Sequence, residues 1–155
     1  MNDYAARLRA TADYIDRHDV PRLLSVTVSG LTDVVDFHGS PLNCNRVAVF
    51  LRWADTLDGD VALVVVPREK DSRFHLYARG TLPGTDLAAE FVVIVDGDDY
   101  PALADEIGSG EDEIPVIRGQ LANIAAGRGE LTPELLAEAE HWAANPLPRD
   151  PGATS

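Results

Sequence analysis

Three short runs rich in β-branched and aromatic residues, between residues 60 and 96, place the strongest constraint on the fold of this chain. They span residues 60–67, 73–79 and 91–95, and residues typical of turns separate them. Such runs predict successive strands, and the short loops between them favour antiparallel neighbours. The middle run alternates between apolar and polar positions, so the sequence predicts a sheet with one buried and one solvated face. The buried side would hold Phe74, Leu76 and Ala78, and the solvated side Arg73, His75, Tyr77 and Arg79.

The residues before this sheet predict two helices and two further strands. Apolar residues at helical spacing indicate a helix over residues 3–18, and alternating apolar residues indicate strands over 23–29 and 33–38. Ser40 followed by Pro41 predicts the start of a second helix, because these residue types are favoured at the N-cap and at the first helical position. The expected order is therefore α-β-β-α-β-β-β, with the two helices flanking the sheet.

The chain changes character after residue 98. We expect a short helix over residues 100–107, and Pro115 is placed to open a helical hairpin over residues 114–144. The predicted fold class is α+β, with a mostly antiparallel sheet, two flanking helices and a C-terminal helical hairpin. The expected divisions are a sheet domain over 1–98, a helical extension over 99–145, and a disordered Pro-rich tail over 146–155.

Composition narrows the classes of partner. The formal net charge is −13, which argues against nucleic acid or an anionic membrane surface and permits a protein partner, including a basic one. The alternative is that the acidic surface serves only solubility. Cys44 is the single cysteine, which fits a reducing compartment. The first residues show no signal peptide and no apolar run is long enough to span a bilayer, so we expect a cytoplasmic protein.

Sequence motifs for cofactor binding or nucleophilic catalysis are missing. There is no Gly-rich phosphate loop, and no catalytic signature surrounds Cys44. A calcium loop counted from Asp96 fails, because its fifth and sixth positions are Tyr100 and Pro101. We therefore expect no cofactor and favour a protein that is not an enzyme.

One enzymatic alternative stays open at this stage. Asp36 and His38 share one face of a predicted strand, and carboxylate and imidazole groups both ligate divalent metals. A site needs a third ligand from elsewhere, for which His75 is the candidate. The alternative hypothesis is thus a small metal-dependent or hydrolytic enzyme that uses these three residues. The competing interpretation is a polar strand face in water.

A binding surface is the favoured hypothesis. The polar side of the run 73–79 combines cationic and aromatic groups, and residues 96–113 hold eight acids and no base. These acids would steer a basic partner, and an exposed Trp would anchor it. The competing interpretations are solvated surfaces for the charges and core positions for the Trp residues. The candidate binding residues are Trp53, Arg73, Tyr77, Asp98, Asp99, Asp112, Glu113 and Trp142.

The first predicted helix carries a family resemblance. Its residues Tyr4-Ala-Ala-Arg-Leu-Arg-Ala-Thr-Ala-Asp13 resemble the start of small actinobacterial and actinophage proteins, and the likeness covers roughly residues 3–98. The resemblance implies a phage or mobile-element origin, and with it a host or defence protein as target. The sequence thus favours a small acidic interaction protein without enzymatic activity.

Overall fold

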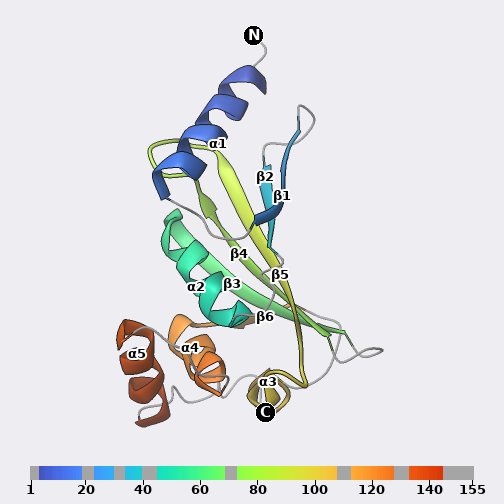
Figure 1. Cartoon of the computed structure of the whole chain (residues 1–155), viewed down its shortest axis with the longest axis vertical. Coiled ribbons are helices and arrows are strands. Elements are labelled where there is room, and N and C mark those ends of the chain that lie inside the picture. Colours follow the sequence, from blue (N-terminus) through green and yellow to red (C-terminus); the bar gives the residue numbers. More distant parts are fainter. Residues whose placement is uncertain are drawn as a thin grey trace, which may run out of the picture.

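A six-stranded sheet forms the frame of the molecule, and its main helices lie on one side of it (Figure 1). The computed structural model describes residues 4–18, 23–29, 34–39, 45–68, 73–107, 113–127 and 133–144. The strands are β1 (Leu23–Val28), β2 (Val34–Gly39), β3 (Asp58–Arg68), β4 (Arg73–Thr81), β5 (Ala88–Asp96) and β6 (Ile114–Val116). The helices are α1 (Tyr4–His18), α2 (Arg46–Asp55), α3 (Pro101–Ile107), α4 (Arg118–Ala126) and α5 (Pro133–Ala144).

The strand order is β1-β2-β5-β4-β3-β6. The predicted α+β class and the antiparallel run β3-β4-β5 are confirmed. The sheet is mixed, however, because β2 pairs with β5 in parallel. After β2 the chain forms α2, β3 and β4 before it reaches β5, the strand that pairs with β2 in parallel. The expected pairing of sequence neighbours concerned only β3, β4 and β5, and the parallel pair of β2 with β5 was not predicted.

The second helix begins later than the sequence suggested. Asn45 is its N-cap, and the Asn45 side chain accepts a hydrogen bond from the Ala48 amide at 3.2 Å. Ser40 and Pro41, the expected start, lie outside the described residues. Asn45 is buried, and its amide group also donates to the Ala125 carbonyl at 2.8 Å. Several residues here are good caps, and the contact with α4 selects Asn45 among them.

The prediction that Pro115 opens a helix is wrong. Ile114–Val116 forms β6, which pairs antiparallel with β3 at the edge of the sheet, and α4 begins only at Arg118. Proline is tolerated in edge strands, because there its missing amide can face away from the ladder. The hairpin is therefore confirmed in part, since α4 and α5 pack on each other but residues 114–116 belong to the sheet.

The core lies between the sheet and the helices. Phe37 of β2 and Phe91 of β5 stack with ring centroids 4.6 Å apart, and Trp53 of α2 stacks on Phe91 at 5.3 Å. Tyr14 of α1 contacts Phe37 edge-on at 5.5 Å. Both α1 and α2 thus cover the same face of the sheet, which we call the covered face. In the described ranges, no helix is long and apolar enough to cross a membrane.

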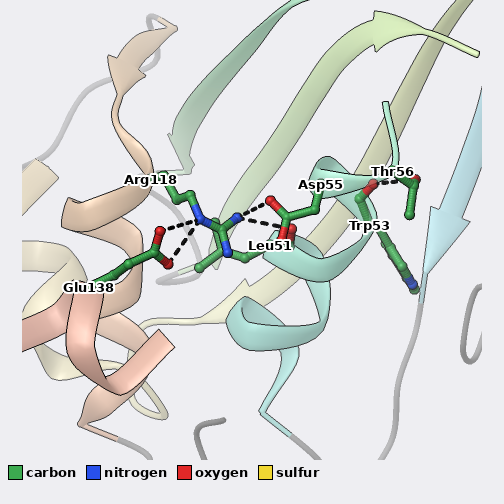
Figure 2. A network of polar contacts seen from close by, with 6 residues as sticks. All are labelled: Leu51, Trp53, Asp55, Thr56, Arg118 and Glu138. Carbon is green, nitrogen blue, oxygen red and sulfur yellow. Dashed lines mark hydrogen bonds and ion pairs between the residues drawn. The ribbon is translucent and has the colours of Figure 1, made fainter. Parts of the chain in front are cut away.

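The C-terminal helices are joined to this core. Figure 2 shows Arg118 of α4 between Glu138 of α5 and Asp55 of α2. The Arg118 Nε donates to both carboxylate oxygens of Glu138 at 2.8 and 3.0 Å, and its Nη1 donates to Asp55 and to the Leu51 carbonyl. The buried residues Leu121 and Leu135 belong to the same cluster as those of the sheet. The expected division at residue 98 therefore does not separate two cores.

Candidate functional site

The face of the sheet opposite the helices is the candidate functional surface, and we call it the open face. None of the described helices packs on it, whereas α1 and α2 cover the other face. Strand register places its side chains in rows across the strands. Val34, Ala88 and Thr81 form a row at one end, and four further rows, numbered from that end, follow. The first row holds Thr27, Asp36, Glu90, Arg79 and Ala62. The second row holds Ser25, His38, Val92, Tyr77, Val64 and Pro115. The third row holds Ile94, His75 and Val66, and the fourth row holds Asp96 and Arg73.

The first row is an electrostatic network. The Arg79 Nε donates to Glu90 at 2.6 Å, and its two terminal nitrogens donate to both carboxylate oxygens of Glu113 at 3.1 and 2.7 Å. The hydrogen bonds that Arg79 donates to Glu113 and, with a smaller effect, to Glu90 raise the pKa of Arg79, and those to Glu113 lower the pKa of Glu113. Glu113 was expected to steer a partner from a solvated segment, and it is instead a fixed partner of Arg79.

Asp36 lies beside Glu90 on the parallel neighbour strand without a cation of its own in this row. Partial burial raises the pKa of Asp36, and repulsion by Glu90 raises it further, while nearby His38 lowers it. Two carboxylates side by side favour a positive charge brought from outside. This end of the open face is therefore suited to a basic group.

The middle rows are apolar over β3, β4 and β5, apart from His75. Val92 and Val64 are only 7% and 8% exposed although no described helix covers them, and Tyr77 lies directly between them in register. Beside them Ile94 is 41% exposed, and Val66 is half-buried. Tyr77 also contacts the guanidinium of Arg79, which lies 5.2 Å from its ring centroid. Sequence analysis found Tyr77 and missed the valines and Ile94.

The signal for the missed residues was hidden by β5. This strand is apolar on both faces, so its sequence shows no alternation between residues 91 and 95. An apolar run of this kind is typical of a strand buried on both sides. If β5 is paired with the alternating strand β4 in the observed register, Val92 and Ile94 fall on the same face as Tyr77.

Arg73 and His75 occupy the far end of the open face, as the alternation of β4 predicted. Arg73 is exposed and lies opposite Asp96 on β5. The rings of His75 and Tyr77 are 6.3 Å apart between centroids. The open face thus has Asp36, Glu90 and Arg79 at one end, an apolar centre, and Arg73 opposite Asp96 at the other end.

The two Trp residues do not reach this surface. Trp53 is completely buried and lies against Gly39, where an added Cβ would be 1.6 Å from its ring. Figure 2 shows it on the side of α2 away from Arg118. Trp142 is half-buried, and it packs on Gly119 between α4 and α5. Trp53 is thus a core residue, and the role of an interface anchor does not fit its position.

The acidic segment is divided by the structure. Asp98 and Asp99 are exposed in the turn after β5, where the Asp98 amide donates to the Asp96 side chain at 2.9 Å. This local hydrogen bond explains the acids as turn formers. Asp112 lies outside the described residues, so its part of the hypothesis stays a prediction.

The metal hypothesis fails on geometry. His38 and His75 point to the same face, but two strand spacings and one row separate them, which is about 12 Å between their Cα atoms. Ligands of one metal ion lie about 2 Å from it. Within the described part of the chain, no three His, Cys, Asp or Glu side chains form a group able to hold a metal. Asp36, His38 and His75 therefore do not make a metal site.

A hollow lies on the side of the helices. It has a volume of about 460 Å³ and lies where α2, β3, β6 and α4 meet, beside Arg118. Its lining is mostly apolar, and the polar group at its rim, Arg118, is already held by Glu138 and Asp55. The two charged residues of this lining, Asp55 and Arg118, are paired with each other.

Comparisons with known proteins give no relative. No family model matches the chain, and neither the curated proteins nor the solved structures contain a match.

Proposed function

We propose that this protein is a non-enzymatic binding module that holds a basic amphipathic helix of a partner protein on its open face. The observation that supports this proposal is the apolar centre of that face, where Ile94 is 41% exposed and Tyr77 and Val66 are half-buried, with none of the described helices over it. Apolar surface of this kind favours a partner that removes it from water.

The dimensions of the apolar centre fit one helix. It extends over β3, β4 and β5, which is two strand spacings or about 10 Å. A helix with its side chains is about 10–12 Å wide. A helix lying along β4 would therefore cover Tyr77 and reach the valines on either side.

Charge favours a basic helix over an acidic one. The chain has a formal net charge of −13, so a basic partner is attracted over long range. At short range, Asp36 lies next to Glu90 and has no cation of its own in the first row. A lysine or arginine from the helix would satisfy this carboxylate. The resemblance of the first helix to actinophage proteins makes a bacterial host or defence protein the first partner to screen.

A titration with helical peptides tests the proposal. Two peptides would share one apolar face and differ only in having Lys or Glu at the polar positions. We expect the Lys peptide to shift the NMR signals of open-face residues in β3, β4 and β5. The Glu peptide should bind at least about tenfold more weakly, because like charges oppose it.

Two matched substitutions locate the binding surface. Ile94 and Leu136 are similarly exposed apolar residues, at 41% and 45%, but Leu136 lies on α5 away from the open face. Ile94→Arg should weaken binding of the Lys peptide at least about tenfold by adding a like charge and removing apolar contact. Leu136→Arg should leave it unchanged. Equal effects of the two variants, or peptide shifts on α4 and α5, would overturn the proposal.

A further inference from the structure

The two edges of the sheet differ in how they are protected. β6 has only three residues, with Pro115 in the middle, which lacks an amide hydrogen. β1 has six residues, Leu23–Val28, and its only strand partner in the described chain is β2. Open edges invite another strand unless charge, proline, brevity or a bulge prevents it. β6 is protected by brevity and proline.

β1 lacks most of these protections. Residues 23–32 contain no charged residue, in a chain of which 25% is charged. A register irregularity lies between Leu23 and Ser25, at the start of the strand, and Ser25 to Val28 pair regularly with β2. Most of β1 is therefore a regularly paired and uncharged template for another strand.

We infer that β1 pairs antiparallel with β1 of a second copy of this chain, so that two sheets join into one. A two-fold axis perpendicular to the sheet keeps each face on its own side. Val26 and Val28 then meet their counterparts on the covered face, and Ser25 and Thr27 meet theirs on the open face. The pairs formed are β-branched or hydroxyl pairs, which are favourable across strands.

Charge repulsion does not prevent this pairing, although each copy has a net charge of −13. On the open face the charged groups nearest the new seam are Asp36 and His38 of β2. The β2 strands of the two copies are three strand spacings apart, about 14 Å. This exceeds the screening length of about 8 Å at physiological salt. Repulsion is therefore weak at the seam, and added salt should strengthen the association.

Sedimentation velocity of the full chain tests the inference. We expect a monomer–dimer equilibrium between about 1 μM and about 1 mM protein, shifted toward dimer when salt rises from about 0.05 to about 0.3 M. The double variant Ser25→Lys and Thr27→Lys should weaken dimerisation at least about tenfold, because charges block an edge. Ala137→Lys with Ala144→Lys adds the same charge at exposed positions of α5 and should leave the dimer intact.

Hydrogen exchange of the unaltered chain provides a second measurement that does not depend on how the variants fold. Amides of β1 should become more protected as protein concentration rises, and amides of β6 should not. A monomer at every concentration, or a dimer unaffected by the β1 lysines in a variant with a native circular dichroism spectrum, would overturn the inference. Failure here leaves the peptide binding proposed for the open face untouched, because that is measured on monomer or dimer alike.

Discussion

The two faces of the sheet differ most clearly at two adjacent residues of β5. Val92 and Val93 are the same residue type, and both are nearly buried, at 7% and 0% exposure. Val93 belongs to the core cluster, whereas Val92 lies outside that cluster and on the open face. Equal burial therefore has two causes in this protein. A buried residue on the covered face packs in the core, whereas Val92 packs outside the core, on the same face as the exposed Ile94.

The largest expected effect comes from adding a Cβ at Gly39, where the Trp53 ring lies against the backbone. In Gly39→Ala, the new Cβ would lie 1.6 Å from the Trp53 ring, so the ring and the strand must separate. We expect a loss of about 3 kcal/mol or more of unfolding free energy, since overpacking a buried site forces strain. Urea unfolding followed by circular dichroism measures this loss.

A matched glycine provides the control. An added Cβ at Gly119 would make ordinary contacts, the nearest being 3.5 Å from Trp142. Gly119→Ala should therefore be neutral or raise stability by up to about 1 kcal/mol, because alanine favours the helix. If Gly39→Ala unfolded at the same urea concentration as the unaltered chain, the packing described for the covered face would be wrong.

The valine pair tests the comparison itself. Val93→Ala should cost about 2 kcal/mol, because it leaves a cavity in a packed core. Val92→Ala should cost about 1 kcal/mol or less, since the open face can relax around it. Binding of the Lys peptide should show the opposite order. Val92→Ala should weaken binding, whereas the folded molecules of Val93→Ala should bind the peptide as tightly as the unaltered chain. Equal losses in both measurements would remove the distinction between the faces.

The Arg118 network should have an intermediate effect. Arg118→Met keeps much of the side chain and removes the hydrogen bonds to Glu138, Asp55 and the Leu51 carbonyl. We expect a loss of about 1 kcal/mol, because the pairs are partly exposed and solvent screens them. Hydrogen exchange should show faster opening of α4 and α5 than of β4 and β5. A uniform change across the chain would mean that Arg118 does not join the helices to α2.

The smallest expected effects are changes in stability when two acids of the open face are replaced. At neutral pH one replacement should raise the stability and the other should lower it. The pKa of Asp36 is raised in the folded chain, so the folded state holds its proton more tightly and loses stability as pH rises through that pKa. Asp36→Asn should therefore be more stable than the unaltered chain at neutral pH, and the difference should disappear in acid. Urea midpoints measured from about pH 3 to about pH 8 test this.

Glu113 is the matched opposite case. Its pKa is lowered by the hydrogen bonds from Arg79, so its contribution to stability is present above the pKa of the unfolded chain and is lost as pH falls. Glu113→Gln should therefore be less stable at neutral pH, with the difference again disappearing in acid. Two variants with the same sign would contradict the contacts described for Asp36 with Glu90 and for Glu113 with Arg79.

Much of the site was within reach of the sequence where the signal was local. The alternation of residues 73–79 correctly placed Tyr77 and His75 on one face and Leu76 on the other. The same logic gave no result for β5, which is apolar on both sides. The sequence also could not assign Trp53, because helical spacing alone does not say which side of α2 meets the sheet.

The amino-acid sequence alone determined the class of the fold, the run β3-β4-β5 and the alternation of β4, because these depend on residues close together in the chain. Tertiary structure decided the rest. Asn45 became the helix cap through its contact with Ala125, and Pro115 entered a strand because β3 offered an edge. The parallel pairing of β2 with β5 brought Asp36 beside Glu90. Each of these depends on partners distant in sequence, and local preference for one residue type cannot select them.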